Sequence, residues 1–280
     1  MLDSTIGICA GADPLVIDEI DELMPSEVLR EENSDIITSG DVLQWFLYAT
    51  HVSLRNRFIY IETPKAACST MKRMLQRLEV DDPEWRRSSY LHDRKCSPLL
   101  TPLQVPSFRR LRQDSCIKKF CVIRSPYTRV LSAYFDKICT HQPQRHIVAE
   151  ILGRTKSQQG DEITFYDFVT AVATQRPEEM DPHWRPQKLL LYVPEFHYDL
   201  MLRVETLDAD IELLGHLLGC DLRPFYSRIQ RGRTDSPLKL PEYYRDDGVF
   251  RLVSRIYQDD IELVRSHLPK GEDLDPRDSR

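Results

Sequence analysis

The sequence carries the same local pattern twice: an apolar strand, a polar loop and then an amphipathic helix. The first copy has its strand at residues 57–62 and a loop, TPKAACS, that leads into a helix with an apolar stripe. The second copy has its strand at residues 119–123 and its helix over residues 127–139. Units of this kind place their strands side by side in parallel. The pattern therefore predicts an α/β fold with a central, mostly parallel sheet flanked by helices.

Composition narrows the class of protein. The chain has 280 residues, of which 41% are hydrophobic, so it can bury one substantial core. Its net charge of −6 argues against a nucleic-acid partner for the whole chain. No stretch reaches the roughly 18 apolar residues of a membrane span, and Asp3 stands where an export signal would be basic. The seven cysteines form no C-x-x-C pair, so we expect reduced thiols and no metal site.

We divide the chain into three segments. Residues 1–53 form an N-terminal helical extension, with helices expected over residues 13–24 and 41–51. Residues 54–270 form the main domain, and residues 271–280 form a C-terminal tail that we expect to be frayed.

Further along the main domain, local signals mark three more elements. Thr164 and Asp167 have the spacing of a capping box that opens a helix. A strand at residues 200–204 precedes a helix that Gly219 ends. Apolar residues at helical spacing predict one last helix near residues 248–268.

The first loop has the parts of an anion site. Lys65 lies in this loop, and Ser69 and Thr70 open the following helix, so a cation and two hydroxyls meet the backbone amides of a helix N-terminus. The G-x-x-x-x-G-K-S/T spacing of a nucleotide-hydrolysing P-loop is absent. The loop is therefore either an ordinary helix start or a phosphate site of another kind.

The second loop favours the phosphate site. Arg124 follows the second strand and Ser132 lies two turns into the next helix, so a guanidinium and a hydroxyl can hold a second anion beside the first. Two adjacent anion sites imply a doubly phosphorylated nucleotide.

With these two loops the chain resembles a known family. From about residue 58 to residue 268 it resembles the sulfotransferases that use 3′-phosphoadenosine 5′-phosphosulfate, and among them the carbohydrate sulfotransferases that modify chondroitin, dermatan and related glycans. The family's Pro-Lys-x-x-Cys-Ser/Thr loop is matched by Pro64, Lys65, Cys68, Ser69 and Thr70. Its Arg-x-Pro-x-x-Arg-x-x-Ser-Ala-Tyr signature is matched by Arg124, Pro126, Arg129, Ser132, Ala133 and Tyr134.

The resemblance implies a P-loop-like sulfotransferase fold, the phosphosulfate nucleotide (PAPS) as donor without a metal, and a hydroxyl of a carbohydrate as acceptor. It implies that the donor binds to Arg124, Ser132, Arg231 and the loop residues Pro64, Lys65, Ala66, Ala67, Cys68, Ser69 and Thr70. Sulfuryl transfer places negative charge on the leaving phosphate oxygen, and Lys65 is expected to neutralise that charge.

The acceptor hydroxyl must also lose a proton, so the reaction needs a general base. Many family members place a histidine between the two loops, and His92 is the only histidine in residues 66–118. His183 and Glu62 are the alternatives. We rank His92 first, because the loop that carries it leads into the strand that ends at Arg124.

Two groups of arginines and one tryptophan each have a functional and a structural interpretation. The arginines of residues 228–233 close over the nucleotide, bind an anionic acceptor or stay solvated, and those of residues 109–112 either bind the acceptor or stay solvated. Trp184 either stacks on a sugar ring or belongs to the core. At residues 189–193 the chain has the apolar run LLLYV, where relatives often carry cysteines.

Two other functions remain open. A P-loop kinase-like phosphotransferase would share the fold but should keep Walker glycines and a metal-binding carboxylate. A non-catalytic glycan-binding relative would bind the desulfated nucleotide without forming product. Since the sequence has no membrane span, we expect a cytoplasmic enzyme if the source is bacterial, and a Golgi-lumen enzyme only if an N-terminal anchor has been removed.

Overall fold

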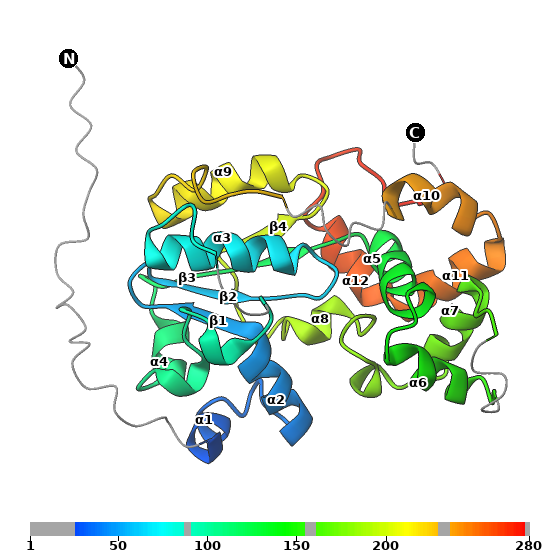
Figure 1. Cartoon of the computed structure of the whole chain (residues 1–280), viewed down its shortest axis with the longest axis horizontal. Coiled ribbons are helices and arrows are strands. Elements are labelled where there is room, and N and C mark those ends of the chain that lie inside the picture. The colour runs from blue at the N-terminus through cyan, green and yellow to red at the C-terminus, as the bar shows by residue number, and fades with distance from the viewer. Residues whose placement is uncertain (1–25, 87–90, 155–160, 229–235, 278–280) are drawn as a thin grey trace.

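The computed structural model describes residues 26–86, 91–154, 161–228 and 236–277 (Figure 1). Within these ranges four strands form one sheet in the order β1-β2-β3-β4. The strands are β1 (Thr50–Ser53), β2 (Phe58–Ile61), β3 (Lys118–Ile123) and β4 (Leu200–Arg203). β1 pairs antiparallel with β2, whereas β2, β3 and β4 run parallel. The predicted α/β fold with a mostly parallel sheet is confirmed.

The central strands are apolar at nearly every position, as expected for a sheet that is buried on both faces. Phe58 and Tyr60 of β2 share one core with Phe120 of β3, and the rings of Tyr60 and Phe120 stack with their centroids 5.5 Å apart. The residues between them belong to the core on the opposite face: Ile59, Ile61, Cys121 and Ile123. This alternation follows from the period of two in a strand.

Helices cover both faces of the sheet. On one face lie α3 (Cys68–Val80) and α9 (Leu207–Leu218), and on the other lie α1 (Ser26–Glu32), α2 (Gly40–Ala49) and α4 (Phe108–Gln113) (Figure 1). The connections contain α8 (Gln187–Leu190) and short 3-10 turns at Arg94–Cys96, Pro102–Gln104 and Pro177–Glu179.

A second group of helices stands beside the sheet, at the end where β3 leads into α5 (Figure 1). Its members are α5 (Pro126–Ala133), a π-helical turn (Tyr134–Cys139), α6 (Gln144–Ile151), α7 (Phe165–Ala173), α10 (Ser236–Tyr243), α11 (Asp247–Ile256) and α12 (Gln258–Arg265). Aromatic rings fill its core: Trp184 is fully buried and meets Phe168 edge to face, with 5.5 Å between ring centroids. Trp184 is therefore a core residue and not an exposed platform for a sugar.

The capping box and the terminating glycine that the sequence predicts are both present in the structure. At the start of α7 the Thr164 hydroxyl accepts from the amide of Asp167, and the Asp167 carboxylate accepts from the amide of Thr164, each at 3.1 Å. At the end of α9, Gly219 adopts a φ of 70°, in the left-handed region that favours glycine. Both boundaries are confirmed.

Two predicted helices end differently. The helix expected over residues 41–51 stops at Ala49, and the next four residues form β1, which adds an antiparallel edge strand to the sheet. The last helix, expected near residues 248–268, is two helices, because Tyr257 leaves helical geometry with φ −112° and ψ 28°.

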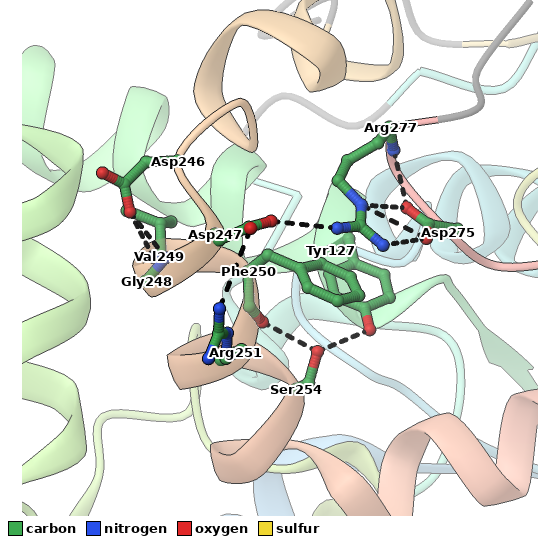
Figure 2. A network of polar contacts seen from close by, with 10 residues as sticks. All are labelled: Tyr127, Asp246, Asp247, Gly248, Val249, Phe250, Arg251, Ser254, Asp275 and Arg277. Carbon is green, nitrogen blue, oxygen red and sulfur yellow. Dashed lines mark hydrogen bonds and ion pairs between the residues drawn. The ribbon is translucent and has the colours of Figure 1, made fainter.

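The expectation of a frayed tail is also wrong for the residues that the structure describes. Arg277 forms ion pairs with Asp275 at 2.6 Å and with Asp247 of α11 at 3.1 Å. Its guanidinium lies 3.9 Å from the ring centroid of Phe250, and the ring of Phe250 also stacks against Tyr127 at the start of α5 (Figure 2). The tail thus contacts α11, and through Phe250 of α11 it packs against α5, the helix that follows the second loop.

Some expectations fall outside the described residues, namely the helix at residues 13–24 and the side chains of Arg231 and Arg233. Across the described ranges, no helix has both the length and the apolar character that crossing a membrane requires. The boundaries drawn at residues 53 and 270 stay predictions.

Candidate functional site

The loop after β2 turns tightly before α3 begins. Lys65 and Ala67 both have positive φ, at 66° and 55°, and Ala67 is the residue before the first turn of α3. No side chain of Ala67 can cap the helix, and first-turn amides have no intrahelical acceptor. Consecutive amides in such a turn form a concavity suited to an anion.

Lys65 adds a cation to this loop. Its ammonium lies 3.0 Å from the carboxylate of Asp136, which the π-helical turn after α5 carries. Burial lowers the pKa of Lys65, while the charge of Asp136 opposes that shift. The same carboxylate also pairs with Lys137 at 3.2 Å. Asp136 therefore fixes the position of the Lys65 ammonium next to the loop backbone.

Arg124, at the end of β3, reaches the same loop. It donates from Nη1 to the carbonyl of Lys65, from Nη2 to the hydroxyl of Ser236 and from Nε to the hydroxyl of Thr128, at 2.8, 2.8 and 2.9 Å. Burial lowers its pKa to about 10, so it stays a cation at neutral pH. Ser132 is buried four residues after Thr128, on the same face of α5. The structure thus brings the two predicted anion loops together.

Arg129 ties this region to a third segment. The fully buried guanidinium donates to the carbonyls of Pro64, Pro182 and Arg185, at 3.0, 3.0 and 2.7 Å. It thereby fixes residues 182–185 against the first loop.

A cavity of about 470 Å³ opens between α2, the first loop and this third segment. All three candidates for the general base line this cavity. Its lining residues are Asp41, Gln44, Trp45, Tyr48, Glu62, Pro64, Cys68, His92, Pro182, His183 and Arg185. The cavity thus borders the Lys65 loop and has room for a substrate.

Glu62 has two close ionic partners. Its carboxylate lies 2.7 Å from the ammonium of Lys72 and 3.0 Å from Nε2 of His51. Burial alone would raise the pKa of Glu62, but these two partners lower it to about 2. The side chain of Arg94 binds the other ring nitrogen of His51. Glu62 is therefore committed to a buried ionic network.

His92 lies between this network and the first loop. Its Nδ1 is 2.6 Å from the ammonium of Lys72, and its Nε2 is 3.1 Å from the hydroxyl of Ser69. Burial, together with the charge of Lys72, lowers the pKa of His92 to about 4. The imidazole is consequently neutral at neutral pH.

His183 is held by a neighbouring carboxylate. Oδ1 of Asp181 lies 2.6 Å from Nδ1 of His183 and accepts from the backbone amide of His183 at 2.9 Å. Burial would raise the pKa of Asp181, yet its hydrogen bonds with His183 lower it overall. Asp181 therefore stays ionised and orients the ring.

Comparison with known proteins assigns this site to a family. The family model described as "Sulfotransferase family" matches residues 49–264. The chain belongs to the sulfotransferase family. The match includes both anion loops, His92 and His183, and it confirms the resemblance inferred from the two loops.

Individual relatives carry more specific names. This sulfotransferase is 34% identical to carbohydrate sulfotransferase 14 of Homo sapiens over 167 residues, which cover 57% of this chain and 43% of the relative. It is 25% identical over 219 residues to carbohydrate sulfotransferase 11 of Rattus norvegicus (72% and 60% covered) and over 263 residues to carbohydrate sulfotransferase 12 of Xenopus laevis (79% and 60%). The chain spans about half the length of these curated relatives. No solved structure gave a significant match.

The additional basic side chains of the sulfotransferase are placed elsewhere. Arg112 of α4 pairs with Asp35, and none of the arginines at residues 109–112 lines the cavity. Arg228 pairs with Asp208 at 2.8 Å. These contacts give no support to a role in acceptor binding.

Sequence reasoning missed several residues of this site. Lys72, Asp136 and Asp181 each contact a predicted site residue, and Trp45 and Tyr48 line the cavity from α2. Only Asp181 had a local signal, since it stands two residues before its histidine.

Proposed function

We propose that this sulfotransferase moves a sulfuryl group from 3′-phosphoadenosine 5′-phosphosulfate to a hydroxyl of a carbohydrate. The observation that carries the proposal is the meeting of two cationic loops, at Lys65 and Arg124, beside a cavity lined by two histidines. The names of the relatives, all carbohydrate sulfotransferases, support the acceptor class.

The residues present suit the two anionic ends of this donor. The amides of the turn at residues 64–70 and the cation of Lys65 suit the 5′-phosphosulfate. Arg124 and Ser132 suit the 3′-phosphate, because a guanidinium and a hydroxyl both donate hydrogen bonds to anionic oxygens. We also assign Arg231 to the donor, as the family resemblance implies.

The chemistry follows from the flow of charge. The acceptor oxygen forms a bond to sulfur while the bond from sulfur to the phosphate oxygen breaks, and the hydroxyl proton moves to a base in the cavity. Negative charge grows on the leaving phosphate oxygen. Lys65, which pairs with Asp136 in this structure, can shift its ammonium toward that oxygen and offset the charge. The protein's own cation performs this task, so the mechanism needs no metal.

Parallel transfer assays with two labelled donors test this proposal against a kinase-like enzyme and a non-catalytic glycan-binding protein. The full chain is incubated with sulfur-labelled donor and a panel of glycans, and in parallel with phosphorus-labelled ATP and magnesium. Transfer of labelled sulfate to a glycan is the expected result. Transfer of phosphate from ATP would identify a kinase-like enzyme, and tight binding of adenosine 3′,5′-bisphosphate without any product would identify a glycan-binding relative.

A further inference from the structure

The two histidines of the cavity have opposite hydrogen-bond partners. Nδ1 of His92 faces an ammonium, Lys72, at 2.6 Å, whereas Nδ1 of His183 faces a carboxylate, Asp181, at 2.6 Å. A neutral imidazole carries its proton on one nitrogen only, and the partner of one nitrogen decides where that proton sits. The two rings are therefore set to different tautomers.

On the His92 side, the ammonium of Lys72 can only donate. It is almost fully buried and lies 2.7 Å from the ionised carboxylate of Glu62. Nδ1 of His92 must accept from Lys72, so the ring proton is on Nε2. That nitrogen lies beside the hydroxyl of Ser69, on the loop proposed to bind the donor.

On the His183 side, the carboxylate of Asp181 can only accept. The ring proton of His183 is therefore on Nδ1, and Nε2 carries a lone pair. Among the described residues no group is within hydrogen-bond distance of this Nε2. The side chain is 27% exposed and lines the cavity, so a substrate hydroxyl can reach it.

The two tautomers match the two needs of the reaction. An anionic donor offers only hydrogen-bond acceptors, so a group beside the donor loop must present an N–H. An attacking hydroxyl needs a lone pair that takes its proton. His92 meets the first need and His183 meets the second.

We propose that His183 is the general base, that Asp181 is its positioning residue, and that Lys72 locks His92 as a hydrogen-bond donor toward the bound sulfuryl donor. The inference rests on the proposed function and assigns the roles within it. As the acceptor oxygen bonds to sulfur, its proton passes to Nε2 of His183 and the leaving phosphate takes the electron pair of the broken bond. The imidazolium that forms is stabilised by Asp181.

Other charged and polar groups face these rings. Tyr48 lies 3.4 Å from Nδ1 of His92, the charge of Glu62 raises the pKa of His92, and the charge of Lys137 lowers it. Burial and the charge of Lys72 outweigh the opposing charge of Glu62, so the pKa of His92 falls to about 4. The surroundings of His92 therefore oppose its use as a proton acceptor.

The first test reads the tautomers directly in the unliganded full chain. Nitrogen-15 NMR of labelled histidines separates protonated from unprotonated ring nitrogens, and His92→Gln and His183→Gln assign the two rings. We expect His92 protonated on Nε2 and His183 protonated on Nδ1. The reverse tautomer at either ring would overturn the proposal. The NMR measurement does not depend on turnover. It therefore tests the two tautomers even if the chain transfers no sulfate.

The second test uses the same two variants in the transfer assay. A glutamine amide can replace an Nε2–H donor but cannot replace a base. His92→Gln should therefore lose no more than about tenfold in kcat, whereas His183→Gln should lose about 10²–10⁴-fold. The acid limb of the pH–rate profile should persist in His92→Gln and vanish in His183→Gln. An acid limb that vanishes with His92 instead would contradict the assignment.

The positioning role of Asp181 has its own readout. Asp181→Asn should lower kcat and release the Nδ1–H preference in the NMR spectrum of His183. It should leave the Kd of adenosine 3′,5′-bisphosphate unchanged, because Asp181 has no hydrogen bond or ion pair with the donor residues that the structure describes. An unchanged kcat together with an unchanged tautomer would rule out that role.

Discussion

At the scale of single residues, the site is built from cations that already have partners. Lys65 pairs with Asp136, and Arg124 donates to the carbonyl of Lys65 and to two hydroxyls. Such pairing holds the side chains in place before substrate binds, so less conformational entropy is lost on binding. A donor that binds at Lys65, as we propose, has to compete with Asp136 for the ammonium.

Replacement of Lys65 tests its role in the chemical step. Lys65→Ala should lower kcat by about 10²–10³-fold, because its charge matters most when the leaving oxygen becomes negative. Donor affinity should change much less. Steady-state kinetics of sulfate transfer measure both quantities. Lys118→Ala, at the opposite end of β3, is the matched control and should behave as wild type. Normal turnover in Lys65→Ala would exclude this role.

The sequence predicted the residues of the two loops but not their partners. Lys65 and Arg124 could be placed together because both follow strands of one parallel sheet, and the ends of such strands share an edge. The pairing of Lys72 with His92 and Glu62 joins three separate segments. A contact of that kind depends on packing that no local pattern encodes.

At the scale of elements, the capped helix α7 and the apolar strands β2 and β3 were predictable, and the short polar strand β1 was not. β1 contains His51 and Ser53, which are fully buried because Glu62 and Glu79 bind their side chains. The helix predicted over residues 41–51 extended into the first two residues of this strand, Thr50 and His51. The break at Tyr257 was hidden, since apolar spacing continues through it.

The end of α9 gives a prediction at this scale. Gly219 has a φ of 70°, and no atom outside its neighbours lies within 4 Å of a Cβ added there. Gly219→Ala should therefore cost only the backbone strain, about 1 kcal/mol of the free energy of unfolding. Gly40→Ala is the control, since Gly40 also has open space but no positive φ. Urea unfolding of both variants measures the difference, and equal stabilities would contradict the argument.

At the scale of the whole molecule, the buried ionic network joins β1, β2, α3 and the 3-10 turn at Arg94–Cys96. Burial, and then the charge of Arg94, lowers the pKa of His51 to about 3. In the unfolded chain a histidine titrates near its ordinary pKa of about 6.5. Below that pH the unfolded state binds more protons, so stability falls as pH falls toward the folded value.

This linkage predicts acid sensitivity in a defined window. Between about pH 6.5 and pH 5, the free energy of unfolding should drop by about 2 kcal/mol through His51 alone. Glu62, whose pKa is lowered to about 2, contributes in the same direction only below its ordinary pKa of 4.5. Urea unfolding across the window measures the slope. His51→Gln should reduce the slope by about half, because His92, whose pKa is lowered to about 4, acts in the same direction across this window. An equally steep slope in that variant would assign the effect to other groups.

The central claim is that the ends of β2 and β3 together bind one doubly phosphorylated nucleotide. Calorimetry with adenosine 3′,5′-bisphosphate and adenosine 5′-monophosphate tests it most directly. Wild type should bind the bisphosphate at least about tenfold more tightly, since a charged hydrogen bond contributes roughly 1.5–3 kcal/mol. Arg124→Ala should lose that preference, and Arg255→Ala, on the exposed side of α11, should keep it. Equal affinity of wild type for the two nucleotides would contradict the claim.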